Sequence, residues 1–119
     1  MFTIKNKDLE AHQKYVRGVI ARLPEAHAVA QHAATAHMHK NAVEAVISAG
    51  LNPKPLGMFH HKGRTVIAID HGDEGDALAD TEYGNYDSPP NPIIRTAMRT
   101  AHPHATVVYN DVIRKEAGF

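Results

Sequence analysis

The longest uninterrupted helical pattern in the chain is residues 24–49, which read PEAHAVAQHAATAHMHKNAVEAVISA. Pro24 suits the first position of a helix, and Gly50 supplies a natural left-handed stop. A continuous helix over this range would be about 39 Å long, so a small domain must be built around it. Small residues along it allow close approach of another helix or sheet of the same chain, or of a neighbouring subunit. The expected inner stripe comprises Val29, Ala33, Ala36, Val43 and Ile47, flanked by Ala26, Ala30 and Val46.

The segments that flank this helix predict one further helix and one clear strand. Residues 8–22 carry apolar side chains mostly on one face, which predicts a separate first helix before Pro24. The Pro- and Gly-rich residues 51–63 predict irregular structure. Residues 65–69, TVIAI, form a β-branched run typical of a strand.

The second half of the chain predicts a hairpin, a short helix and a last strand. Residues 71–76 are polar and suit a hairpin connection, after which residues 77–83 form either the returning strand or a helical turn. Pro92 opens a third helix over residues 92–101, because proline fits a first helical position, and Pro103 ends it. Residues 106–109, TVVY, predict a last strand, followed by a tail over residues 110–119 that is either irregular or a short helix. The order of elements indicates an α+β fold in a single domain, residues 1–119.

Composition excludes several classes of protein. The chain has 119 residues, no cysteine, 43% hydrophobic and 22% charged residues, which is typical of one globular domain. The absence of cysteine excludes a disulfide scaffold, a thiolate zinc site and a cysteine nucleophile. No apolar run is long enough for a membrane span, and the first residues lack a signal-peptide core.

Charge is balanced overall but divided along the chain. Thirteen Lys and Arg match thirteen Asp and Glu, which disfavours a generic nucleic-acid binder. Residues 1–64 hold nine basic and four acidic residues, whereas residues 65–119 hold four and nine. These two halves either face each other within one fold or favour head-to-tail association between copies.

The ten histidines invite a metal hypothesis that their spacing does not favour. They include the pairs His37/His39, His60/His61 and His102/His104. A helical zinc site uses histidines four residues apart, and no pair here has that spacing. Residues 37 and 39 would point to nearly opposite sides of a helix. We therefore expect no metal ligands, and a His/Asp metal-binding module or metal-dependent hydrolase stays an alternative.

No catalytic or cofactor motif stands out either. The acidic run from Asp70 fails the helix-loop-helix calcium pattern, because Gly72 and Thr81 occupy ligand positions. Ser48 and Ser88 lie outside any nucleophile elbow, and no phosphate-binding glycine loop is present. The residues predict a protein that is not an enzyme and that uses no cofactor.

Two blocks between residues 77 and 98 carry the most specific pattern. The first is residues 77–84, ALADTEYG, and the second is residues 90–98, PNPIIRTAM. Together they resemble the tail-completion, or head-to-tail connector, proteins of long-tailed bacteriophages. In that family a hairpin strand ending in Glu-Phe-Gly is followed by a loop and by Pro-x-x-Phe-[Leu/Ile]-Arg-Pro-Ala-[Leu/Met], which opens a helix. The matching residues are Glu82, Tyr83, Gly84, Pro92, Ile94, Arg95, Ala97 and Met98.

The chain also departs from the family pattern. Tyr83 replaces the phenylalanine, Ile93 an aromatic residue, and Thr96 the second proline. The usual Tyr-Ala is Leu78-Ala79, one position closer to the glutamate. The motif blocks cover about a fifth of the chain, and the order of elements agrees along nearly all of it. Glu82 and Arg95 either pair across the loop and fix this corner, or remain two separately solvated charges.

The resemblance implies a structural virion protein of the phage neck. It would form a six-fold ring at the head–tail junction, contact neighbouring neck and tail-terminator proteins, and let DNA pass without reading its sequence. Such a protein is made in the bacterial host cytoplasm and ends in the virion. The candidate subunit or lumen contacts are Asp73, Glu74, Asp76, Lys62 and Arg64. A tail-terminator protein, which would have more strands, and a small regulatory dimer built on the Ala-rich helix are further alternatives.

Overall fold

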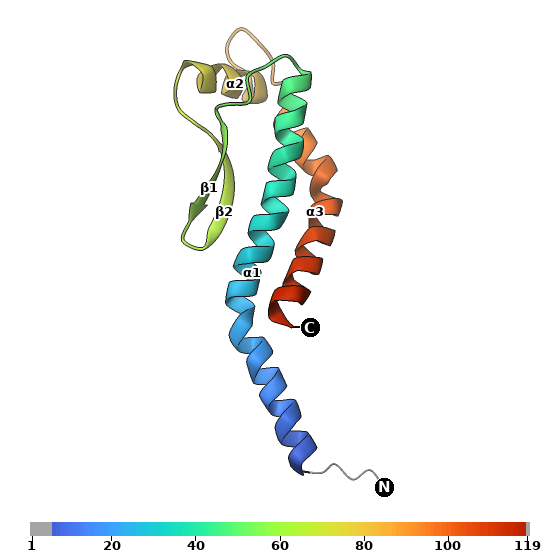
Figure 1. The fold of residues 1–119 in the computed structure, drawn as a ribbon. Helices are drawn as coiled ribbons and strands as arrows, with labels where there is room; N and C mark the ends of the chain where they lie inside the picture. The colour runs from blue at the N-terminus through green and yellow to red at the C-terminus, as the bar shows by residue number, and fades with distance from the viewer. Residues whose placement is uncertain (1–5, 119) are drawn as a thin grey trace.

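The computed structural model describes residues 6–118 as three helices and one strand pair (Figure 1). In chain order these are helix α1 (Asn6–Ser48), strand β1 (Leu56–His61), strand β2 (Arg64–Ile69), helix α2 (Asp73–Tyr83) and helix α3 (Ile93–Ala117). The α+β class expected from the sequence is confirmed, whereas several element boundaries are wrong. Expectations that concern residues 1–5 and Phe119 lie outside the described residues.

Helix α1 is one helix where the sequence predicts two. Pro24 lies inside it rather than at the start of a second helix. Proline lacks an N–H, so the carbonyl of Ile20 has no helical donor four residues on. The side chain of Pro24 is exposed, which lets the ring project into solvent, and the blue part of α1 runs at an angle to the cyan and green part (Figure 1). The helix therefore absorbs the proline as a bend.

Strand β2 is confirmed, but its partner precedes it instead of following it. The antiparallel pair joins Leu56 to Ile69 and His61 to Arg64. The two-residue connection is Lys62-Gly63, with both residues at positive φ, as a type I′ turn requires. Residues 56–61, expected to be irregular, are thus the first strand. Lys-Gly is a weaker turn signal than Asn-Gly or Asp-Gly, which is why composition alone misplaces the hairpin.

Residues 73–83 form helix α2, so the strand alternative for residues 77–83 is wrong, as is the hairpin connection at 71–76. The buried residues of α2 are Gly75, Leu78 and Glu82, spaced three and four apart as one helical face requires. A Cβ on Gly75 would lie 1.8 Å from the carbonyl oxygen of Asp70. Glycine therefore lets the first turn of α2 pack against the preceding loop.

Helix α3 continues through Pro103 to Ala117, so the third helix does not end there and no strand forms at residues 106–109. Pro103 is exposed, as Pro24 is. Ala101 and Ala105 are buried four residues apart on one face of the helix, and Ala117 is buried at its end. Packing against α1 thus overrides the β propensity of Thr106-Val107-Val108-Tyr109.

The antiparallel helices α1 and α3 form the body of the molecule, and α2 and the hairpin lie beside one end of it (Figure 1). One core cluster joins all the elements, with Val46, Leu56, Leu78 and Ile94 at its centre. A second, smaller cluster packs Val19 and Ala26 of α1 against Ala117. The predicted stripe on α1 is displaced: the flanking residues Ala26, Ala30 and Val46 are buried, whereas Val29 and Ile47 are exposed.

None of the described helices contains an apolar stretch long and hydrophobic enough to cross a bilayer.

Replacing either helical proline by alanine should stabilise the fold. Pro24→Ala and Pro103→Ala each restore a backbone donor at an exposed position, so the free energy of unfolding should rise by about 1–3 kcal/mol. Urea denaturation followed by circular dichroism measures this. Pro89→Ala, in the loop before α3, gains no helical hydrogen bond and serves as the control. Unchanged or lower stability in both helical variants would contradict the bent-helix description.

Candidate functional site

The motif residues meet where α2 ends and α3 begins. The side chain of Glu82, in the last turn of α2, is only 2% exposed. Its Oε1 accepts the Ile94 N–H at 2.7 Å, and its Oε2 accepts the Arg95 N–H at 3.1 Å. These amides belong to the first turn of α3 and have no acceptor within that helix. The carboxylate therefore caps α3 from twelve residues away, at the positive end of the helix dipole.

Arg95, in the first turn of α3, in turn contacts the C-terminal end of α2. Its Nε donates to Glu82 Oε2 at 2.8 Å, and its Nη2 donates to the backbone carbonyl of Glu82 at 2.7 Å. That carbonyl is one of the last four of α2, and such carbonyls have no N–H donor within their own helix. The guanidinium also lies over the ring of Tyr83, 4.8 Å from its centroid, a cation–π geometry. We call this set of contacts among Glu82, Ile94 and Arg95 the reciprocal cap, because each helix end is satisfied by the other.

The pairing hypothesis for Glu82 and Arg95 is thereby confirmed, and the alternative of two solvated charges is wrong. The arginine side chain is 44% exposed and the glutamate is buried, so the pair is half-desolvated. Burying a carboxylate costs free energy unless its oxygens are hydrogen-bonded. Both oxygens of Glu82 have partners, and among the described residues no buried side-chain polar atom lacks one.

The loop between the two helices is tightly braced. Gly84 has φ +79°, and a Cβ there would lie 2.7 Å from the nitrogen of Pro90. The Asn91 N–H donates to the carbonyl of Thr81 at 2.8 Å. The Oδ1 of Asn85 accepts the N–H groups of Asp87 and Ser88, each at 2.9 Å. These contacts brace residues 84–92, which have no regular secondary structure.

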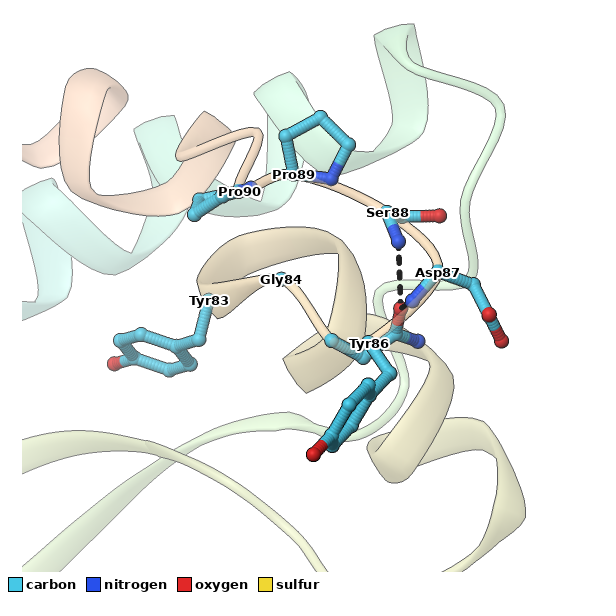
Figure 2. Close-up of a pocket in the computed structure, with 8 residues that line it drawn as sticks. Tyr83, Gly84, Tyr86, Asp87, Ser88, Pro89 and Pro90 are labelled. Atoms are coloured by element: carbon cyan, nitrogen blue, oxygen red, sulfur yellow. Dashed lines mark hydrogen bonds between the residues drawn. The ribbon is translucent and has the colours of Figure 1, made fainter.

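An open hollow of about 420 Å³ lies along this loop and is lined by residues 83–90. Figure 2 shows the rings of Tyr83 and Tyr86 on the side of the loop away from Pro89. Tyr86 is fully exposed. Asp87 is the one charged residue among those that line this hollow.

The remaining motif residues support the same corner. Pro92 precedes α3, and its carbonyl accepts the Thr96 N–H at 3.1 Å. Ile94 is buried in the main cluster, against which Met98 packs, and Ala97 is half-buried on the same helix. The family pattern was expected to place Glu82 on a strand, and the structure corrects this to a helix end.

The candidate contact residues lie in two separate places. Asp73, Glu74 and Asp76 are exposed in the first turn of α2. Lys62 and Arg64 are exposed at the tip of the hairpin. The one ion pair found between residues 6 and 118 joins Glu82 to Arg95, both from the acidic half of the chain. The opposite charges of the two halves therefore do not pair within one copy in the described part.

The histidines are dispersed among the helix and hairpin contacts. His37 meets His104 of α3 edge to face, with ring centroids 4.4 Å apart. His39 donates from Nε2 to the carbonyl of Leu56 at 2.9 Å, so residues 37 and 39 face opposite sides, as predicted. His32 and His60 lie within 3.3 and 3.5 Å of the Thr65 hydroxyl. Across the described residues no three His, Asp or Glu side chains gather as a metal site.

Comparison with protein-family models, with curated proteins and with solved structures finds no match for the chain. What the sequence did not reveal is the helical nature of residues 73–83. The spacing of Gly75, Leu78 and Glu82 carries that signal, together with three acidic residues in the first turn. With α2 recognised as a helix, Glu82 becomes its last-turn residue and a natural cap for the next helix.

Removing the charge of Glu82 should destabilise the protein strongly. In Glu82→Gln the amide nitrogen would face a donor in a buried site, either the Ile94 N–H or those of Arg95, so we expect a loss of about 2–4 kcal/mol in unfolding free energy. Denaturant melts measure it. Glu74→Gln on the exposed first turn of α2 is the matched control and should change stability by less than about 0.5 kcal/mol. Equal effects of the two substitutions would show that the reciprocal cap does not form.

Two glycines with nearly equal φ separate backbone strain from steric contact. Gly50 has φ +76° with nothing within 4 Å of an added Cβ, whereas Gly84 has φ +79° with Pro90 at 2.7 Å. Gly84→Ala should therefore cost at least about 1 kcal/mol more than Gly50→Ala. The comparison uses the same denaturant melts. Matching losses would mean that the loop does not close over Gly84.

Proposed function

We propose that the chain is a structural protein of a bacteriophage virion that forms a ring in the neck, at the head–tail junction, and completes the tail. DNA would pass through the ring without sequence recognition, and neighbouring neck and tail-terminator proteins would be its partners. The observation that carries the proposal is the reciprocal cap. The residues that resemble the tail-completion family are the ones that build this corner of the fold.

The extended form of the molecule supports assembly. Its radius of gyration is 20.8 Å, against about 13.5 Å for a compact chain of this length. Its accessible surface is 8703 Å², against about 6,300 Å² for a compact monomer of 13.0 kDa. A chain that leaves this much surface uncovered is typical of a subunit that buries it against other subunits.

Exposed apolar side chains lie where such contacts would form. The N-terminal part of α1 extends past the end of α3 (Figure 1), and residues 7–17 are all exposed. Leu9, Val16 and Ile20 are exposed there at spacings of seven and four, which place them on one stripe. An uncovered apolar stripe on a projecting helix favours a protein partner.

The alternatives draw less support. A tail-terminator protein was expected to have more strands, and the described residues contain a single strand pair. A metal-dependent hydrolase needs a cluster of ligands, and residues 6–118 bring no three together. A regulatory dimer would use the Ala-rich face of α1, but Ala26, Ala30 and Ala42 are already buried, in a helix that packs against α3.

The proposal predicts a closed ring. Native mass spectrometry and negative-stain electron microscopy of the full chain should give a single ring species, with six copies expected from the resemblance. Gold-labelled antibody against the chain should mark the head–tail junction of virions. A monomer or dimer in solution, together with absence of the chain from virions, would overturn the neck assignment.

A further inference from the structure

The hairpin presents an outer sheet face that nothing in the described chain covers. Phe59 and Val66 are direct cross-strand partners, and each is 43% exposed. Thr65, next to Val66, is buried. Its N–H donates to Gln31 Oε1 of α1 at 3.2 Å, and its hydroxyl lies 3.3 Å from His32 Nδ1. Alternate residues therefore face inward, and the Phe59/Val66 pair faces outward. A two-stranded sheet is marginally stable by itself. Covering this face would stabilise it.

Charge divides the middle of the chain into two adjoining blocks. Residues 45–69 contain Lys54, Lys62 and Arg64 and no acidic residue. Residues 70–91 contain seven acidic residues and no lysine or arginine. Glu82 is used in the reciprocal cap, and the others are exposed. The first block includes the hairpin and the second includes α2.

Within one copy Lys54 lies near the first turn of α2 and lines a hollow with Asp73 and Glu74 without forming an ion pair, whereas the basic residues of the hairpin tip are far from it. Lys62 and Arg64 lie at the hairpin tip, while α2 follows its base, six residues or about 20 Å away along the strands. This exceeds the screening length of about 8 Å at physiological salt. Figure 1 shows the tip directed away from α2. Within the described part of the chain, neither the tip residues nor Asp73, Glu74 and Asp76 form an ion pair.

The surface of α2 has a counterpart to the apolar outer face of the hairpin and another to its basic tip. A hollow of about 170 Å³ beside α2 is lined by the apolar residues Leu51, Ala77 and Leu78 and by Asn52 and Glu74. Its apolar floor suits an aromatic side chain. The exposed carboxylates of the first turn of α2 lie next to it and suit a basic hairpin tip.

We propose that the outer face of the hairpin docks on α2 of a second copy of the chain. Phe59 and Val66 cover the hollow at Leu51 and Ala77, and the tip pairs with the first turn of α2. The occupant is a second copy because the chain itself carries the complementary charge, and its own hairpin tip is too far from α2 to pair with it. The contact is heterologous, so each copy uses its hairpin once and its α2 once, and the copies form a ring when the rotation between neighbours closes. This contact refines the proposed ring and rests on it.

Charge reversal tests the pairing. Lys62→Glu with Arg64→Glu, and separately Asp73→Lys with Glu74→Lys, should each weaken self-association at least about tenfold at low salt. The chain that carries all four changes should recover self-association, because the hairpin tip and the first turn of α2 then again carry opposite charges. Arg99→Glu, an exposed change on α3, is the matched control. All sites are exposed, so circular dichroism should show an unchanged fold, and sedimentation velocity reports association.

Cysteine cross-linking tests the geometry, because the natural chain has no cysteine. A mixture of Arg64→Cys chains and Asp73→Cys chains should form a mixed disulfide dimer under mild oxidation. Arg64→Cys mixed with Arg99→Cys should form it at least about tenfold more slowly. Equal rates for the two mixtures, or failure of the chain with all four charge reversals to recover self-association, would overturn the hairpin–α2 contact.

The outcomes separate this contact from the ring proposal. Rings that persist in both charge-reversed variants, with no preferred cross-link, would refute the contact and leave the neck ring standing. A preferred cross-link in a chain that is absent from virions would support the contact and refute the neck assignment. A chain that stays monomeric at high concentration and gives no preferred cross-link would refute the contact.

Discussion

The buried carboxylate of Glu82 holds together the two helix ends on which the rest of the molecule depends. It supplies acceptors to the first amides of α3, while Arg95 supplies a donor to the last turn of α2. The start and direction of α3 are fixed in this way, and α3 then runs back along α1. Because Ile94 is itself in the capped turn, the same contact seats its side chain in the main core cluster. Backbone satisfaction and apolar packing thus meet at one residue.

Beyond that corner the protein has only a small hydrophobic core in the described residues. Its core consists of one cluster where all elements meet and a smaller one at the far end of the helix pair. Much of the contact between α1 and α3 is made by alanines, which allow close approach but bury little apolar area each. The projecting part of α1, the outer face of the hairpin and the acidic surface of α2 stay uncovered. A fold that is well packed at the reciprocal cap and leaves these surfaces exposed suits a subunit that buries them against other subunits on assembly.

The sequence predicted the class of fold and offered the pairing of Glu82 with Arg95 as one of two alternatives, but it did not predict the course of the chain through its prolines. Pro24 and Pro103 are ordinarily helix boundaries, yet both rings point to solvent while alanines on the opposite faces pack. Tertiary burial of Ala105 and Ala117 outweighs the strand propensity of the valines between them. The hairpin was predicted at the wrong place in the chain because its Lys-Gly turn is a weak signal. The charged candidates at the hairpin tip and on α2 were visible in the sequence, whereas their separation within one copy appears only in three dimensions.

The most direct test of the reciprocal cap is amide hydrogen exchange at Ile94 and Arg95. First-turn amides usually exchange rapidly, because they have no acceptor within their helix. The structure predicts slow exchange at both, close to that of buried amides in the middle of α3, since the Glu82 carboxylate accepts them out of contact with water. Rapid exchange at both amides in an otherwise protected α3 would show that Glu82 does not cap the helix, and would contradict the account of how the fold is held together.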